Sequence, residues 1–136
     1  MNDNKRSHLE MIQGVVNRLS QNSFLLKGWS VVLVSALMAL AAKDSNIIFV
    51  LLAYFPSIAF WLLDGYFLWQ EKLFRALYDM VRTQEENTIN FSMDTSVIKD
   101  KVDSWSEVTI SKTLLIFHGV VLFSIIVIMF FFIFNK

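Results

Sequence analysis

Three long apolar runs constrain this chain more than any other feature of its sequence. The last run extends from Thr113 to Phe134, and 17 of its 22 residues are Leu, Ile, Val or Phe. As a helix it would be about 33 Å long, which is enough to cross a hydrocarbon core of about 30 Å. Each such residue near the centre favours insertion by about 0.3 to 0.6 kcal/mol. The run therefore predicts a transmembrane helix.

The two earlier runs predict a transmembrane hairpin. Ser23–Ala42 is interrupted only by Lys27, and Ile47–Trp69 contains Asp64. The polar residues Lys43–Asn46 separate them, and a connection this short is common between antiparallel neighbours. An alternative is a secreted protein, because residues 39–42 resemble a cleavage site. The polar region of residues 1–22 is long and helical in pattern, which disfavours that alternative.

The composition excludes several classes of soluble protein. Of the 136 residues, 55% are apolar and 18% are charged, whereas soluble domains carry about a quarter charged residues and cannot bury this much apolar surface. The net charge of zero gives no basic excess for nucleic acid, and the lack of Cys excludes disulfides and thiolate sites. We expect an all-α integral membrane protein with three transmembrane helices, forming one domain over residues 1–136.

The distribution of basic residues predicts the orientation of the chain, because cytoplasmic segments are enriched in Lys and Arg. Lys43 and Lys136 fall on one side of the predicted membrane. The other ten lie on the opposite side or at its edge: Lys5, Arg6, Arg18, Lys27, Lys72, Arg75, Arg82, Lys99, Lys101 and Lys112. We therefore expect a cytoplasmic N-terminus, an external C-terminus and any soluble protein partner in the cytoplasm.

The segments outside the apolar runs also have helical patterns. Residues 1–22 predict an amphipathic cytoplasmic helix, whose apolar face would pack on another helix or lie on the membrane surface. The second span should continue as a cytoplasmic helix to about residue 86. The connection at residues 88–111 should contain one short helix, capped by Asp94 or Ser96 and including Val97, Val102 and Trp105.

Three polar residues fall within the predicted spans. Pairing the hairpin about its turn places Lys27 near the depth of Asp64, and His118 lies about one turn inside the cytoplasmic edge. They are candidates for an intramembrane polar layer, either as an ion-sensitive contact or as structural groups. In the structural alternative Asp64 pairs with Lys27 or with Arg75 of a neighbouring subunit, and His118 donates to a backbone carbonyl.

Two further groups of residues are candidates for packing and for positioning in the bilayer. Small residues form a stripe on the first span, and we expect them to pack helices within the hairpin or, alternatively, between subunits. Four aromatic residues near the cytoplasmic interface predict a belt that fixes depth. The stripe is Gly28, Ser35, Ala39 and Ala42, and the belt is Trp29, Trp61, Tyr66 and Trp69.

No combination of residues predicts catalysis. His8 and His118 are the only histidines, and no Gly-rich phosphate loop or metal-ligand spacing is present in the sequence. We therefore expect no enzyme activity, no cofactor and no metal site.

Two motifs resemble a group of small, mostly uncharacterised bacterial membrane proteins. The motifs are NSFLLKGW at residues 22–29 and FWLLDGY at residues 60–66, followed by Glu71, Phe74, Arg75, Leu77 and Tyr78. The resemblance implies an inner-membrane protein, of a group associated with anti-phage defence loci. The group has a Tyr where this chain has His118, and it has no settled active site, so the resemblance implies no role for that position.

These features favour a homo-oligomeric membrane effector or regulatory subunit that changes membrane permeability when a cytoplasmic partner triggers it. The alternative is a passive anchor or assembly subunit for such a partner. A small oligomeric transporter is a third hypothesis, which would require a discontinuous helix near mid-membrane, and Pro56 and Ser57 are its only support.

Overall fold

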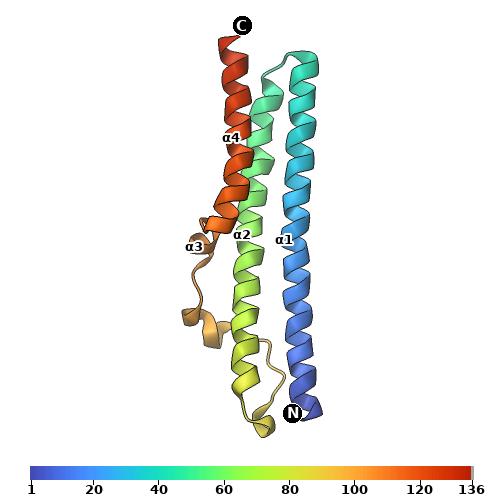
Figure 1. Cartoon of the computed structure of the whole chain (residues 1–136), viewed down its shortest axis with the longest axis vertical. Helices are drawn as coiled ribbons and strands as arrows, with labels where there is room; N and C mark the ends of the chain where they lie inside the picture. The colour runs from blue at the N-terminus through green and yellow to red at the C-terminus, as the bar shows by residue number, and fades with distance from the viewer. Residues whose placement is uncertain (136) are drawn as a thin grey trace.

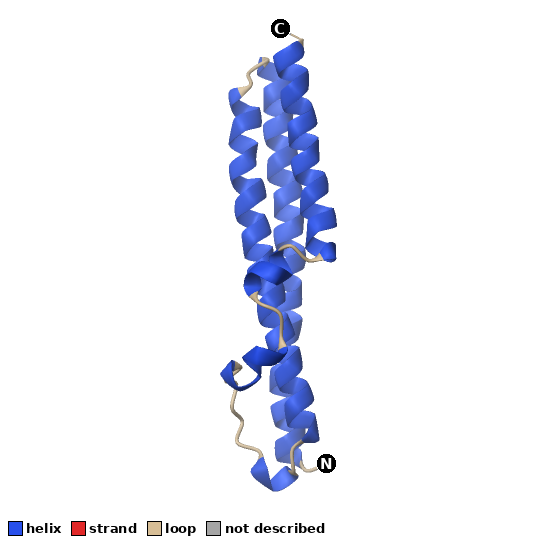
Figure 2. Cartoon of the chain, turned by 90° about the vertical axis from the view of Figure 1, so that its left-hand side faces the viewer, coloured by secondary structure: helices blue, strands red, loops and turns tan. Residues whose placement is uncertain are grey.

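The computed structural model describes residues 1–135, and Lys136 lies outside that range. Helices make up 85% of the chain, and these residues contain no strand. Two short 3₁₀ helices and one short α-helix lie between the second and third long helices, and a short turn joins the first two (Figures 1 and 2). The elements are α1 (Asp3–Asp44), α2 (Ile48–Thr83), η1 (Glu86–Thr88), η2 (Ser96–Lys101), α3 (Trp105–Thr109) and α4 (Lys112–Phe134). All three long helices are long and apolar enough to cross a membrane, as predicted.

The first long helix is continuous from the N-terminal region into the first apolar run. Its 42 residues give α1 a length of about 63 Å, so the predicted amphipathic segment and the first span form one rod. Asn2 caps the start by accepting a hydrogen bond from the Lys5 backbone N–H at 2.9 Å. The helix is followed by a left-handed Ser45, with φ of 50°, and the Asn46 side chain then accepts a hydrogen bond from the Ile48 backbone N–H at 3.0 Å.

The second long helix also runs without a break. It passes through Pro56 and ends at Thr83, three residues before the predicted end. The transporter hypothesis needed a discontinuous helix here, so Pro56 no longer supports it. Figure 1 shows α2 between α1 and α4, with the C-terminal end of α4 beside the turn that joins α1 to α2.

The upper part of the molecule exposes most of its apolar side chains. In the most apolar stretch of each long helix, only 17% to 28% of the residues are buried inside the chain. Apart from Met11, the exposed large apolar residues of α1 begin at Phe24; on α2 they continue to Tyr66, and they cover α4. A chain in water would not leave such a surface uncovered, so this band is compatible with a membrane location.

The lower part of the molecule buries its apolar side chains. We call it the stalk: residues 1–22 of α1, α2 from Gln70, and the segment 84–104. Leu9 and Ile12 of α1 pack with Leu77 and Val81 of α2 and with Ile98 of η2. The amphipathic face of residues 1–22 therefore packs on another helix in the chain, which was the first of the two predicted alternatives.

The connection between α2 and α4 differs from the sequence-based prediction. One helix was expected, but η2 and α3 are separate, because residues 102–104 are extended or irregular between them. Ser104 begins α3 with a capping box, in which its side chain accepts from the Glu107 N–H and Glu107 binds the Ser104 N–H. The capping residue is therefore Ser104, while Asp94 accepts only from the Ser96 N–H before η2.

The short helix α3 packs closely against α2 at a glycine. A Cβ atom added to Gly65 would lie 3.0 Å from the Thr109 Cβ and 3.1 Å from its Cα. Thr109 is held in place because its hydroxyl donates to the Trp105 carbonyl at 2.8 Å. Any side chain larger than that of glycine at position 65 would force Thr109, and with it α3, away from α2.

We expect Gly65→Ala to destabilise the protein by about 1 to 3 kcal/mol, because the added methyl group overpacks this contact. Gly28→Ala is the matched control, since nothing lies within 4 Å of a Cβ there. The control should be neutral or stabilising by up to about 1 kcal/mol, because alanine favours helix over glycine. Unfolding by sodium dodecyl sulfate in mixed micelles, followed by circular dichroism, measures both variants. Equal effects of the two changes would contradict this account of α3.

Candidate functional site

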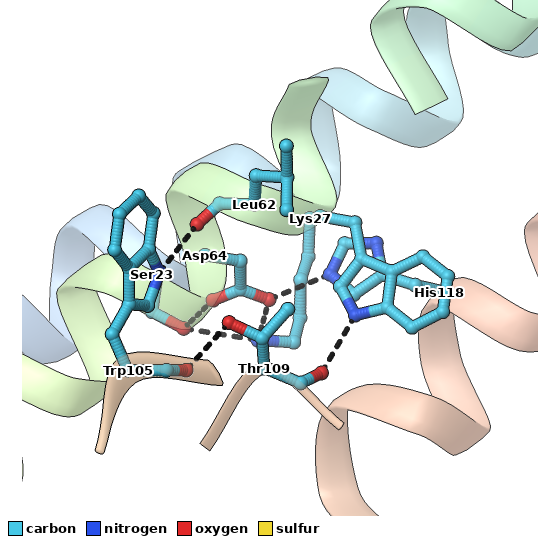
Figure 3. Close-up of polar contacts among 8 residues, drawn as sticks. Ser23, Lys27, Leu62, Asp64, Trp105, Thr109 and His118 are labelled. Atoms are coloured by element: carbon cyan, nitrogen blue, oxygen red, sulfur yellow. Dashed lines mark hydrogen bonds and ion pairs between the residues drawn. The ribbon is translucent and has the colours of Figure 1, made fainter. Parts of the chain in front are cut away.

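The structure brings the three predicted polar residues together on one carboxylate. The Lys27 Nζ of α1 lies 2.6 Å from the Asp64 Oδ2 of α2, and the His118 Nε2 of α4 lies 2.8 Å from the same oxygen (Figure 3). The antiparallel pairing of the hairpin explains the first contact, because residues equally far from the turn lie at the same depth. This cluster joins all three long helices at the lower end of the exposed apolar band.

Ser23, which in the sequence is only the first residue of an apolar run, completes the cluster. Its hydroxyl donates to the Asp64 Oδ1 and accepts from the Lys27 Nζ at 2.9 Å. Ser23 lies four residues before Lys27, so both side chains project from one face of α1. That spacing, beside a carboxylate at the matching depth, is the signal that would have identified it. We call Ser23, Lys27, Asp64 and His118 the Asp64 cluster.

Because they are buried together, the side chains of the Asp64 cluster depend on one another for hydrogen bonds and charge balance. Asp64 and His118 are fully buried, and Lys27 is 23% exposed. The carboxylate accepts hydrogen bonds from Ser23, Lys27 and His118, so its charge is matched by one ammonium and its oxygens are bonded. A buried carboxylate without these partners would cost several kcal/mol. Removing one partner therefore leaves the remaining buried groups without a hydrogen bond or a counter-charge, which lowers the stability of the fold.

The predicted pairing of Asp64 with Lys27 is present within the chain, the alternative pairing with Arg75 of a neighbouring subunit stays a prediction, and the predicted partner of His118 was wrong. Arg75 pairs with Glu71 on its own helix at 2.8 Å, so within this chain Asp64 has Lys27 as its cationic partner. His118 donates to the Asp64 carboxylate and not to a backbone carbonyl. The other ring nitrogen of His118 is Nδ1. It is buried and has no partner.

Trp61 packs against the Asp64 cluster and is also one of the four residues of the predicted aromatic belt. Its ring stacks on His118, with centroids 5.8 Å apart and planes at 6°. Its indole N–H donates to the Thr109 carbonyl at 2.8 Å, and the Trp105 indole N–H donates to the Leu62 carbonyl at 3.2 Å. These bonds hold α3 across α2 beside the cluster. Sequence spacing could not indicate them, because both acceptors are backbone atoms.

The other three belt residues differ in their surroundings. Trp29 is 58% exposed and Tyr66 is 38% exposed, so both can face the surroundings of the protein, as a belt requires. Trp69 is partly buried against the stalk core, and the Lys99 ammonium lies 5.9 Å from its ring. Trp69 therefore belongs to the stalk packing. The membrane depth of these residues stays a prediction.

The small-residue stripe does not pack the hairpin. Gly28, Ser35, Ala39 and Ala42 are all exposed, and nothing within the chain lies near a Cβ at Gly28. The expectation of packing within the hairpin is therefore wrong for these residues. The face of α1 that meets α2 is instead formed by Ser23, Ser30, Val34 and Ala41. Packing between subunits through the stripe stays a prediction.

Two buried hydroxyl groups lie deeper in the helix bundle than the cluster. Ser30 is about 4.5 Å along α1 from Lys27, and Ser57 is about 10.5 Å along α2 from Asp64. Both side chains are fully buried, and neither hydroxyl has a hydrogen-bond partner. Beyond them the bundle is apolar, with Val34, Ala53 and Ile125 in one core. The polar groups therefore extend partway along the bundle and stop at that apolar core.

The site holds charge and exchanges hydrogen bonds between side chains of three helices. Among residues 1–135, no group of three or more His, Asp or Glu side chains is placed to hold a metal ion. The one histidine in the cluster contacts a carboxylate that is already paired with Lys27. We therefore regard the cluster as a link between helices.

A double-mutant cycle tests that link. Asp64→Asn should cost on the order of 3 kcal/mol of stability, because it leaves the Lys27 ammonium without a carboxylate. The double variant with Lys27→Met should cost less than the sum of the single changes, by about 1 to 3 kcal/mol. The matched control is the exposed pair Asp79 and Arg82, 3.4 Å apart, with coupling below about 1 kcal/mol. The same detergent unfolding measures all variants, and additivity at Lys27 and Asp64 would contradict the pairing.

Comparisons with protein-family models, with curated proteins and with solved structures found no significant match to this chain. The resemblance to the bacterial membrane protein group therefore stays a prediction. The function has to be argued from the geometry and charge of the chain itself.

Proposed function

We propose that the chain is a non-enzymatic integral protein of a bacterial inner membrane, with its N-terminus and stalk in the cytoplasm. Two observations support this proposal. The exposed apolar band begins at Phe24 and ends at Tyr66 on the hairpin, while residues 1–22 and 67–104 expose only a few large apolar side chains. The basic residues are concentrated on the stalk side of that band.

Within the membrane, we propose that the protein is an oligomeric effector or regulatory subunit that increases membrane permeability when a cytoplasmic partner acts on the stalk. The observation that carries this proposal is the Asp64 cluster. It joins all three long helices at the level where the stalk meets the apolar band. A change in the stalk that separates Lys27 or His118 from Asp64 would leave a buried charge, which is stable only if water enters.

The continuity of the two hairpin helices gives the stalk a direct path to the cluster. α1 carries Ser23 and Lys27, and α2 carries Asp64, without a loop between these residues and the stalk core. A rotation or axial shift of either helix in the stalk would therefore move its cluster residues by a similar amount. A flexible linker would have absorbed such a movement.

The unpartnered groups in the cluster and beyond it support a change in permeability more than a purely mechanical role. The His118 Nδ1 and the hydroxyls of Ser30 and Ser57 are buried without partners, so water can satisfy them if the bundle loosens. The apolar core of Val34 and Ile125 closes the path in the packed state. In this proposal the packed chain is the closed form.

Two further parts of the proposal concern assembly and context. The exposed stripe that includes Gly28 and Ala39 would allow close helix contact between copies of the chain. The resemblance of residues 22–29 and 60–66 implies a role in anti-phage defence, with a cytoplasmic sensor as the partner.

The second candidate function is a passive anchor for a cytoplasmic partner. The rigid stalk favours it, because Leu9, Ile12 and Ile98 already form a packed platform that needs no conformational change. In that case the Asp64 cluster would only stabilise the fold. The two candidates differ in whether cluster variants change permeability at equal protein level.

The orientation can be tested with single cysteines, because the natural sequence has none. Asp44→Cys, at the exposed end of α1, should react with an impermeant maleimide added outside intact cells. Asn87→Cys, which is exposed at the end of the stalk, should react only after the cells are permeabilised. Labelling of Asn87→Cys in intact cells would contradict the proposed orientation.

The effector proposal is tested by inducing the protein in bacteria together with the gene products encoded beside it and infecting the cells with phage. We expect the membrane potential, measured with a voltage-sensitive dye, to collapse after infection. Asp64→Asn should make the membrane potential independent of infection. The potential should either be low before infection or stay unchanged after it. Asp79→Asn, which removes an exposed charge from the stalk, is the control and should behave as the natural protein.

Protein levels in the membrane fraction separate the two candidates. If the membrane potential never changes, the effector proposal fails. If, in addition, the partner leaves the membrane fraction when this protein is deleted, the anchor is favoured. If Asp64→Asn changes the response only in proportion to a lower protein level, the cluster has a structural role alone.

A further inference from the structure

An open pocket lies between α2 and the segment that leaves η2, which runs beside α2 in Figure 1. Its volume is about 240 Å³. Three of the four lining residues are charged, and all three are exposed, so a ligand in the pocket can reach their side chains. The lining is Lys72, Lys101, Val102 and Asp103.

The pocket lies just below the exposed apolar band. On α2 that band ends at Tyr66, and Lys72 follows about 9 Å further along the helix. The segment after the pocket returns to the level of the band, because the Trp105 indole N–H donates to the Leu62 carbonyl at 3.2 Å. Lipid headgroups occupy about 5 to 7 Å on each side of the hydrocarbon core, and a lysine side chain can extend its ammonium group toward them. With the band in a membrane, the pocket is therefore at the depth of the headgroups.

The charges of the lining are not paired with one another. The ion pairs of residues 1–135 involve other side chains. Lys72 and Lys101 therefore present two ammonium groups to the pocket, and Asp103 presents one carboxylate. Charges of both signs around one accessible pocket match a ligand that itself carries a negative and a positive group.

Neighbouring contacts hold this lining in place. The Lys99 ammonium lies 5.9 Å from the Trp69 ring, which joins η2 to α2. At the end of η2 the Val102 N–H donates to the Lys99 carbonyl at 3.3 Å, and Ser104 then begins α3 with its capping box. The segment between η2 and α3 is therefore ordered before a ligand binds, which lowers the entropy cost of binding.

We propose that this pocket binds the headgroup of phosphatidylethanolamine from the membrane leaflet on the stalk side. The phosphate lies between the ammonium groups of Lys72 and Lys101, and the ethanolamine ammonium donates to the Asp103 carboxylate. The acyl chains lie against the exposed apolar band. The bound lipid links α2 and the segment after η2 to the leaflet, and so fixes the depth of the stalk. This inference rests on the membrane location in the proposed function.

Two other phospholipids share the phosphate but lack the group that Asp103 binds. Phosphatidylcholine has a trimethylammonium group without an N–H donor, and phosphatidylglycerol has hydroxyl groups and no positive charge. Free phosphoethanolamine has the same two charged groups as the proposed headgroup, but it has no acyl chains to contact the band. These three compounds therefore separate the charge pattern, the hydrogen bond to Asp103 and the lipid source.

The test is native mass spectrometry of the full purified chain in a neutral detergent, titrated with the three phospholipids, all with identical acyl chains. We expect phosphatidylethanolamine to bind about three- to tenfold more tightly than either of the others, the range for an ion pair only partly shielded from water. Free phosphoethanolamine at the same concentration should not displace it.

Three variants assign the binding to this pocket. Lys72→Gln and Lys101→Gln remove contacts to the phosphate, so each should weaken binding of all three phospholipids by about three- to tenfold. Asp103→Asn removes the carboxylate, so it should abolish the preference for phosphatidylethanolamine while phosphatidylglycerol still binds. All three side chains are exposed, so the variants should fold as the natural chain does.

Two controls match these changes in charge. Arg18 is exposed on α1 and lies about as far below Lys27 as Lys72 lies below Asp64, so Arg18→Gln removes a positive charge at a similar depth outside the lining. Asp100→Asn removes an exposed negative charge from η2, also outside the lining. Both controls should bind the three phospholipids as the natural chain does.

Several results would overturn the proposal. These are equal binding of the three phospholipids, a preference for phosphatidylethanolamine that survives in Asp103→Asn, a loss with Arg18→Gln as large as that with Lys101→Gln, and displacement by free phosphoethanolamine at equal concentration. Because binding in detergent requires neither a change in permeability nor an orientation in cells, failure of the effector proposal would leave this result unaffected. The cysteine labelling described above tests the membrane location separately.

Discussion

The pairing of one buried carboxylate with partners from two other helices is the interaction on which the rest of the structure depends. Asp64 lies in the middle helix, and without Lys27 and His118 its charge could not be kept out of water at that depth. The pairing fixes the depth of α1 and α4 relative to α2. It also fixes where α3 must cross, because Thr109 meets Gly65 directly beside Asp64.

The long helices make that local interaction relevant to the whole molecule. Both hairpin helices extend past the exposed apolar band into the stalk, so packing in the stalk and pairing at Asp64 are properties of the same two rods. The stalk buries its apolar residues, whereas the band exposes them. A single chain therefore combines a stalk whose apolar residues are buried with a band whose exposed apolar surface is compatible with a membrane. This division is the physical basis for proposing a membrane subunit that responds to a cytoplasmic partner.

Much of the architecture could be predicted from local patterns. The limits of the apolar runs predicted the start of α2 and both ends of α4 to within a residue or two, because helix length and apolar content are properties of a continuous segment. The segment at residues 88–111 was predicted less well. Its two short elements are set by Ser104 capping and by contacts with α2, and a weak local pattern could not separate them.

The candidate site could be predicted only in part. Lys27, Asp64 and His118 were noticeable as polar residues in apolar runs, and the hairpin register related the first two in depth. Ser23 could have been recognised by its spacing from Lys27, but Thr109 accepts the Trp61 hydrogen bond through its backbone carbonyl, which no residue pattern indicates. The small residues beginning at Gly28 formed a clear stripe, but a stripe does not tell which neighbour covers it, and α2 packs on another face.

The sequence by itself determined that the chain forms three long apolar helices with a polar segment on one side, because periodicity, length and charge act along the chain. The tertiary structure alone decided which groups share the Asp64 carboxylate and which face of α1 meets α2. It also decided where α3 crosses α2, at the contact of Thr109 with Gly65. These features depend on the rotation of each helix about its axis, and that rotation is set by side chains from distant parts of the chain.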